Sequence, residues 1–389
     1  MKSITNAPAE ELHALVTSGV ADGWNVEFRT SLPLMTDAGQ LEFLGDVCSF
    51  ANGPGGNILY GATPRTDAPV ELRGFDTLSV AQALTWLEEA VAAGISPRVI
   101  GIKFKIVEVT KQKSLLAIHV PKSWSGPHLV SFKDSNQFFS RNQHGKYLLN
   151  VGELRSAFLL TESLRDKLRN FRLERMNAIT NRTLSIQLST APKTVLHIVP
   201  LCAFAPGFRI DVSQVAAMEP GMFKPMQSRS LVTHFNYDGM MAFSSMEKFA
   251  YSYMQVFRNG CLEAGETLML ELRDGRKYIP GVAFEKEIIQ CGERMVGLLR
   301  RLEVPPPYVA MLSFLGVKGY SMFIGSMRWQ SNAHHIERDD LYLDDVIIED
   351  PTQDFSQIIR PAFDQVWNSC GWAKSMNYDD AGKWHETAR

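Results

Sequence analysis

The sequence predicts an α+β fold in more than one domain, because helical and strand patterns alternate along a chain that is too long for a single core. The chain has 389 residues, which exceeds the roughly 250 to 300 residues at which one core usually stops growing. Hydrophobic residues make up 45% and charged residues 21% of it, as in ordinary globular proteins. We therefore expect a mixed sheet with helices at residues 1–150, a connecting helix at 151–182 and a mixed α/β domain of unknown function at 183–389.

Charge and cysteine content exclude several classes of protein. The net charge is only −2, which argues against a histone-like polyanion binder but permits a local basic face. The sequence shows neither an apolar run of about 18 residues nor an apolar N-terminal leader, so we expect a cytoplasmic protein that does not bind membranes. The five cysteines are widely spaced without a CxxC pair, which favours neither a disulfide framework nor a zinc site.

The first 150 residues alternate between strand and helix patterns. Apolar residues recur at helical spacing over 41–51 and 79–93, and the glycine-rich segment 52–56 ends the first of these helices. The remaining apolar runs predict strands at 25–29, 58–60 and 138–141, and a hairpin formed by 104–109 and 115–120.

A long charged helix begins at Val151, and strands and helices follow it. The clearest signal is Asn259-Gly260, which predicts a hairpin between 251–257 and 261–270. Other patterns predict strands at 195–199 and 308–315 and a helix at 284–302. His197 lies in an apolar strand and is interpreted as a core histidine. The acidic residues around 346–348 indicate an edge strand whose charges prevent it from pairing with another chain.

Two motifs carry a resemblance to a known family. Residues 22–29 read Asp-Gly-Trp-Asn-Val-Glu-Phe-Arg, and residues 48–61 read Cys-Ser-Phe-Ala-Asn-Gly-Pro-Gly-Gly-Asn-Ile-Leu-Tyr-Gly. Together they resemble the Schlafen/Alba-type domain, in which a strand with an acidic residue precedes a helix that ends in Phe-Ala-Asn and a Gly-Gly turn. Later landmarks at 95–97, 120–128 and 139–154 follow in the same order, so the resemblance covers about residues 20 to 155 and implies nucleic-acid binding.

The resemblance also implies a metal site, because nucleolytic Schlafen members hold a divalent ion with three carboxylates. Two of these positions match Asp22 and Glu27, and Asp67 matches the third if the intervening loop is longer. Oxygen ligands suit Mg²⁺ or Mn²⁺, and Arg29 stands at the family's lysine position, where it would hold a phosphate oxygen. Because Glu27 and Arg29 are two residues apart on a strand, an ion pair between them is the alternative.

Basic residues mark a candidate surface for nucleic acid. Lysines lie on or near the predicted hairpin at Lys103, Lys105, Lys111 and Lys113, and Arg141 and Lys146 follow two phenylalanines. Such residues can neutralise phosphates and stack on bases. Alternation of charge on a solvated strand face is an equally good explanation.

The glycine-rich segment is not a nucleotide-binding loop. Residues 53–56 lack the lysine of a phosphate loop, and no GxxxxGK motif occurs elsewhere, so no ATP binding is expected. Gly55 and Gly56 favour a tight turn over an anion-binding nest, and Asn52 favours a cap that bonds nearby backbone.

These observations lead to two hypotheses about function. The first is a nucleic-acid-binding protein that acts as a metal-dependent nuclease, for which the resemblance implies a homodimer or higher oligomer and a role in antiviral defence. The second is a non-catalytic DNA-binding regulator or assembly component, whose C-terminal domain senses a protein partner. The sequence does not distinguish DNA from RNA as the polymer.

Overall fold

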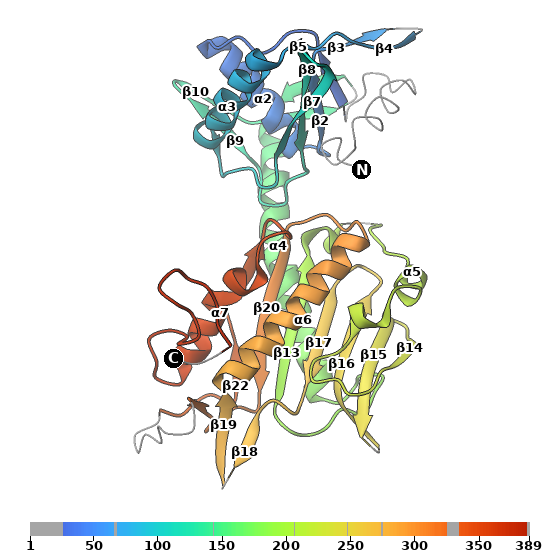
Figure 1. Ribbon diagram of the computed structural model, residues 1–389, viewed down its shortest axis with the longest axis vertical. Coiled ribbons are helices and arrows are strands. Elements are labelled where there is room, and N and C mark those ends of the chain that lie inside the picture. Colours follow the sequence, from blue (N-terminus) through green and yellow to red (C-terminus); the bar gives the residue numbers. More distant parts are fainter. Residues whose placement is uncertain are drawn as a thin grey trace. The chain divides into compact units, whose positions relative to one another are not determined.

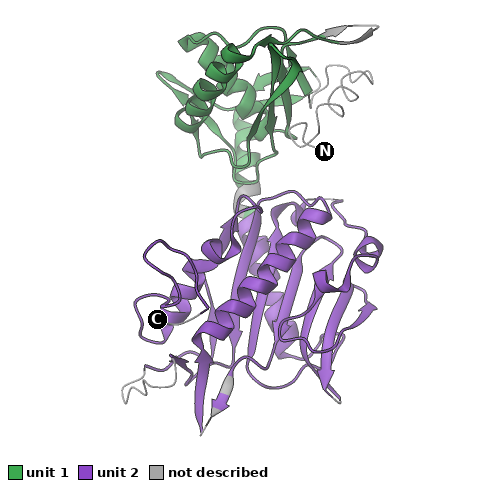
Figure 2. Cartoon of the chain, viewed as in Figure 1, with its two compact units in different colours: residues 1–163 green, residues 164–389 purple. Residues whose placement is uncertain are grey.

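The computed structural model describes residues 26–65, 68–142, 144–205, 207–246, 248–273, 275–324 and 334–386. The chain divides into two compact units, residues 1–163 and 164–389, which Figure 2 shows in different colours. The division falls inside one long helix, α4 (Val151–Thr180). Both units combine helices with sheets (Figure 1), which confirms the predicted α+β class.

The first unit contains twelve named strands and two helices before α4 within its described residues. In chain order they are β1 (Val26–Arg29), α2 (Asp37–Ala51), β2 (Gly56–Tyr60), β3 (Ala62–Arg65), β4 (Ala68–Leu72), β5 (Phe75–Asp76), α3 (Thr77–Gly94), β6 (Ile95–Ser96), β7 (Lys103–Thr110), β8 (Lys113–Val120), β9 (Leu129–Phe132), β10 (Ser135–Gln137), β11 (Phe139–Asn142) and β12 (Gly145–Leu148).

The main sheet of this unit has a parallel pair at one end. β1 pairs in parallel with β2, which places Glu27 beside Ile58, and α2 makes the crossover between them. β2 pairs antiparallel with β8, and β5 and β7 each pair with β8. α2 and α3 cover one face of this sheet, where Leu44, Leu87 and Ile118 belong to one buried core.

The second unit contains a larger sheet. Its elements after α4 are β13 (Lys193–Pro200), a 3-10 turn (Leu201–Phe204), α5 (Val212–Ala216), a second 3-10 turn (Pro220–Phe223), β14 (Val232–Phe235), β15 (Gly239–Met246), β16 (Phe249–Phe257), β17 (Leu262–Glu266), β18 (Glu271–Arg273), β19 (Arg276–Pro280), α6 (Gly281–Arg301), β20 (Tyr308–Leu315), β21 (Ser321–Phe323), β22 (Asp340–Tyr342), β23 (Val346–Ile348) and α7 (Phe355–Ser369).

This sheet is antiparallel and is covered on both faces. Its order is β14-β15-β16-β17-β13-β20, with β22 and β23 both pairing with β20. α6 packs on one face through Phe284, whose ring contacts that of Phe314, while the second half of α4 packs on the other through Phe171, whose ring contacts that of His197. The β16–β17 hairpin predicted from Asn259-Gly260 is confirmed, with Gly260 at φ +83°.

No helix among the described residues is both long enough and apolar enough to span a lipid bilayer.

Candidate functional site

β1 presents its two charged side chains toward α2. Val26 and Phe28 point into a small core on the opposite face of the sheet, and successive side chains alternate along a strand. Glu27 and Arg29 therefore share the helix-covered face. The Arg29 Nη2 atom lies 2.6 Å from the Glu27 Oε1 atom, so the ion pair that the spacing allowed is present.

α2 adds two carboxylates that the sequence analysis missed. Glu42 and Asp46 are four residues apart and so lie on one side of the helix. Arg29 reaches both, with 3.1 Å from its Nη1 atom to Glu42 Oε1 and 2.7 Å from its Nη2 atom to Asp46 Oδ2. Asp46 stands inside the buried run Phe43–Ala51, where a charge requires a partner, but this burial follows from packing and is not marked in the local sequence.

The β11–β12 hairpin supplies the matching positive charges. Arg141 and Lys146 are directly opposite each other in its register, a placement of like charges that destabilises an isolated pair of strands. Each is neutralised by a different carboxylate. Arg141 Nη2 lies 2.7 Å from Glu27 Oε2, and Lys146 Nζ lies 2.6 Å from Asp46 Oδ1.

These contacts form an alternating series of charges, which we call the charge chain. It consists of Arg141, Glu27, Arg29, Asp46 and Lys146, with Glu42 attached to Arg29. It joins three elements that are distant in sequence, namely β1, α2 and the β11–β12 hairpin. Three positive and three negative side chains balance, so the structure brings four predicted site residues together as a neutral cluster.

Burial shapes the proton affinities within the charge chain. Burial raises the pKa of Asp46, and the nearby Glu27 carboxylate adds to the rise, although Lys146 and Arg29 act against it. Burial tends to lower the pKa of Arg29, but Asp46 and Glu27 outweigh it and the net pKa is raised. The guanidinium group of Arg141 stacks 3.7 Å from the centre of the Phe50 ring, which holds this arginine in place.

The predicted metal site has only one member among the described residues. Asp22 and Asp67 lie outside them. Both Glu27 oxygens contact an arginine nitrogen, one from Arg29 and the other from Arg141. The described residues contain no group of three His, Cys, Asp or Glu side chains that could hold a metal ion. The Mg²⁺ or Mn²⁺ site stays a prediction, because two of its three carboxylates lie outside these residues.

The Phe-Ala-Asn and Gly-Gly motif has a structural role in the described unit. Gly55 has φ +76°, and a Cβ atom there would lie 2.5 Å from the Lys122 backbone nitrogen, which confirms a tight turn under the sheet. The expectation for Asn52 was wrong in one respect. Its side chain bonds distant rather than nearby backbone, accepting from His128 N at 2.7 Å and donating to Phe139 O at 2.9 Å, and so ties β11 to the end of α2.

The four predicted lysines lie on the β7–β8 hairpin, whose pairing confirms the predicted hairpin. Lys103, Lys111 and Lys113 are exposed and Lys105 is half-buried. Lys103 and Lys105 are at the start of β7, whereas Lys111 and Lys113 are at the turn. At the usual rise per residue, six residues of strand separate the two pairs by roughly 20 Å, so they form two basic positions along one hairpin.

The second unit contains a largely buried group of polar residues, which we call the Glu263 cluster. Arg175 on α4 donates two hydrogen bonds to Glu263 on β17, at 2.8 and 3.0 Å. His197 Nε2 lies 2.9 Å from Glu263 Oε2, and the Tyr253 hydroxyl donates to Oε1 at 2.8 Å. His197 is a partnered core histidine, as predicted, while Glu263 was missed.

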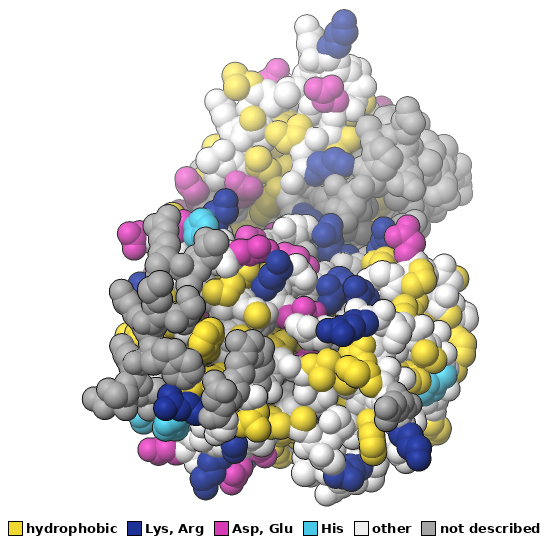
Figure 3. All heavy atoms as spheres, turned by 60° about the horizontal axis from the view of Figure 1, so that its bottom comes forward, with side chains coloured by type: hydrophobic (Ala, Val, Ile, Leu, Met, Phe, Trp, Pro, Cys, Tyr) yellow, Lys and Arg dark blue, Asp and Glu magenta, His cyan; other side chains and the backbone are white. Residues whose placement is uncertain are grey.

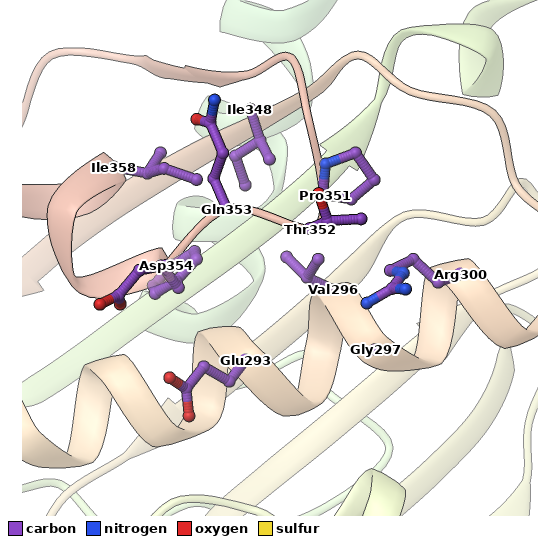
Figure 4. A pocket seen from close by; sticks show the side chains of 11 residues that line it. Glu293, Val296, Gly297, Arg300, Ile348, Pro351, Thr352, Gln353, Asp354 and Ile358 are labelled. Atoms are coloured by element: carbon purple, nitrogen blue, oxygen red, sulfur yellow. The ribbon is translucent and has the colours of Figure 1, made fainter. Parts of the chain in front are cut away.

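A pocket of about 340 Å³ also lies in the second unit (Figure 4). It is formed by α6, through residues that include Glu293, Val296 and Arg300, and by the segment that leads into α7, through residues that include Gln353 and Asp354. None of the predicted site residues lines it.

Comparison with known proteins adds to this picture. No curated protein matches the chain significantly. The solved structures that are similar to it include the following two. The N-terminal domain of a RecG-related protein from Nitrosomonas europaea is 21% identical and has a TM-score of 0.23, over 31% of this chain and 74% of that one. The DIP2311 protein from Corynebacterium diphtheriae is 17% identical and has a TM-score of 0.26, over 38% of this chain and 28% of that one.

The family comparison is more specific. The family model described as Schlafen, AlbA_2 matches residues 22–150. The matched segment begins at Asp22, contains every residue of the charge chain and the lysine hairpin, and ends just before α4. Residues 22–150 are therefore a Schlafen/AlbA_2 domain.

Proposed function

We propose that the first unit binds nucleic acid, with the β7–β8 hairpin as its phosphate-binding element. The observation that carries the proposal is the placement of lysines at both ends of one hairpin within a Schlafen/AlbA_2 domain. Lysine side chains bind phosphates as point charges without reading sequence. A hairpin with two basic positions roughly 20 Å apart suits a polymer with evenly spaced phosphates.

The charge chain is proposed to support this element rather than to bind phosphate itself. Arg29, Arg141 and Lys146 each contact a carboxylate of the same unit, and release of any one of them would remove one of the cations that hold Glu27 or Asp46. Their role in this proposal is to hold the β11–β12 hairpin against α2 and β1. The lysines of β7–β8 then carry the affinity, and it falls steeply as salt rises.

Metal-dependent cleavage in antiviral defence is the second candidate function. It is favoured by the family match, which includes Asp22 and Glu27. For this activity Glu27 would have to leave Arg29 and Arg141 and join Asp22 and Asp67 around Mg²⁺ or Mn²⁺. We place this function second because both Glu27 oxygens contact arginines. The non-catalytic alternative, a DNA-binding regulator or assembly component whose second unit senses a protein partner, would bind nucleic acid as in the first proposal and would not cleave it.

The Glu27→Ala variant separates the two candidates. Labelled single-stranded and duplex DNA and RNA are incubated with the full chain, and both binding and cleavage are followed in Mg²⁺, in Mn²⁺ and in EDTA. If the first unit only binds nucleic acid, the Glu27→Ala variant should bind every polymer that the wild-type chain binds, in Mg²⁺, in Mn²⁺ and in EDTA. Metal-dependent cleavage that Glu27→Ala abolishes would establish the second function. Absence of binding to every polymer by the parent protein would refute the proposal.

A further inference from the structure

The eight-stranded sheet of the second unit has two edges that differ in charge. At one edge, β22 and β23 lie in an acidic segment that contains Asp339, Asp340, Asp344, Asp345, Glu349 and Asp350. At the other edge, residues 231–237 read Leu-Val-Thr-His-Phe-Asn-Tyr and contain no Asp, Glu, Lys or Arg. Charged residues are a common device that keeps a sheet edge from pairing with another chain. The β14 edge lacks that device.

The backbone of β14 has polar groups directed away from its own sheet. Asn236 and Gly239 exchange both of their backbone hydrogen bonds, at 2.9 and 3.3 Å. Because hydrogen-bonded and non-bonded pairs alternate in an antiparallel ladder, His234 also bonds to β15 while Thr233 and Phe235 direct their N–H and C=O groups outward. Within the part of the chain that the structure describes, no strand pairs with that outer side.

The side chains along this edge are also apolar and accessible. Val232 is 48% exposed, Phe235 58% and Tyr237 95%. Figure 3 shows hydrophobic side chains reaching the surface on the right-hand side of the second unit, the side on which β14 lies in Figure 1. An uncharged edge with exposed aromatic rings and outward backbone groups is complementary to another strand of the same kind.

We propose that β14 pairs antiparallel with β14 of a second copy of this chain, which joins two eight-stranded sheets across a two-fold axis. The register with the greatest overlap places the axis at His234, so that Thr233 lies opposite the partner's Phe235 and exchanges both backbone hydrogen bonds with it. A second copy is the occupant that fits best, because a two-fold axis sets each residue against the same uncharged segment and brings no like charges together. The resulting dimer contains two Schlafen/AlbA_2 domains.

The first test compares Thr233→Pro with Thr233→Ala in the full chain by sedimentation over a range of concentrations. Proline removes the outward N–H of Thr233 but no bond to β15, whereas alanine keeps the N–H and removes the same side-chain atoms. We expect wild type and Thr233→Ala to dimerise alike, and Thr233→Pro to dimerise at least about tenfold more weakly. A wild-type monomer at every concentration, or equal dimerisation of the two variants, would overturn the proposal.

A second measurement does not depend on the folding of the proline variant. On its outer side His234 would form a non-hydrogen-bonded pair with the partner's His234, and such pairs have Cα atoms about 4.5 Å apart, within the range for a disulfide. The five native cysteines are all buried. Mild oxidation should therefore link His234→Cys into a covalent dimer much faster than Phe235→Cys, whose side chain would face the partner's Thr233. Equal or absent linking of both variants would contradict the pairing.

Discussion

The charge chain of the first unit and the Glu263 cluster of the second combine the same kinds of side chain but differ in the exposure of the glutamate at their centre. Glu27 and Arg29 keep 20% and 31% of their side chains exposed, whereas Glu263 and His197 keep none and Arg175 keeps 15%. Both Glu263 oxygens are bonded by side chains of the same unit. The comparison teaches that the Glu263 cluster fastens α4 to the sheet, while the charge chain fastens a hairpin that borders solvent.

The largest expected effect is at Arg175. Arg175→Ala leaves the Glu263 carboxylate buried without its cation, and removal of one partner of a buried ion pair typically costs about 3 to 5 kcal/mol. Arg169→Ala on the exposed side of the same helix is the matched control and should change stability by less than about 0.5 kcal/mol. Chemical denaturation of both variants measures the difference. Similar stabilities for the two would show that the Glu263 cluster does not fasten α4.

The pH dependence of stability is the next effect. Burial alone would raise the pKa of Glu263, but hydrogen bonds from His197 and Arg175 lower it from 4.5 to about 2. A carboxylate with a depressed pKa in the folded state adds stability above its unfolded pKa, and this stability is lost as pH falls from 4.5 through 2. Denaturation between these pH values should show that loss in wild type and a smaller loss in Glu263→Gln. Parallel curves would contradict the assignment.

Glu266 on the same strand should change stability with pH in the opposite direction to Glu263. Burial raises its pKa from 4.5 to about 7, so the folded state keeps a proton that the unfolded state releases. Stability should therefore fall as pH rises from 4.5 to 7, and Glu266→Gln should flatten that interval alone.

A smaller effect is expected in the charge chain. Arg141→Ala removes one partner of Glu27, but Arg29 remains and the carboxylate is partly solvated. We expect a cost of about 1 to 3 kcal/mol, with faster amide hydrogen exchange in β11 and β12. Arg141→Lys should recover part of the loss, because it keeps the charge without the planar stacking on Phe50. A cost equal to that of Arg175→Ala would remove the distinction between the two clusters.

The sequence predicted most helices and strands but only some contacts of the candidate site, and the reason is physical. Strand and helix periodicity is local, so the hairpin around Gly260 and the strand at 308–315 were predicted closely. The contact between Glu27 and Arg29 followed from a spacing of two on one strand. The contact between Glu27 and Arg141 joins residues 114 positions apart and depends on how β11 packs against β1, which no local pattern encodes.

Local patterns did not resolve the partners of the buried charges. Asp46 and Glu263 both stand among buried residues, so each has a partner, but the neighbouring sequence does not indicate which. Asp67 and Asp22 lie outside the described residues, so their convergence with Glu27 stays a prediction.

The most direct test of the account is the salt dependence of nucleic-acid binding by the Lys111→Ala, Lys113→Ala double variant. Each lysine that contacts a phosphate contributes about one unit to the slope of log affinity against log salt concentration. We expect a slope that is shallower than that of wild type by about two, while Glu27→Ala keeps the wild-type slope. An unchanged slope in the lysine variant would contradict it, because the phosphates would then be bound elsewhere.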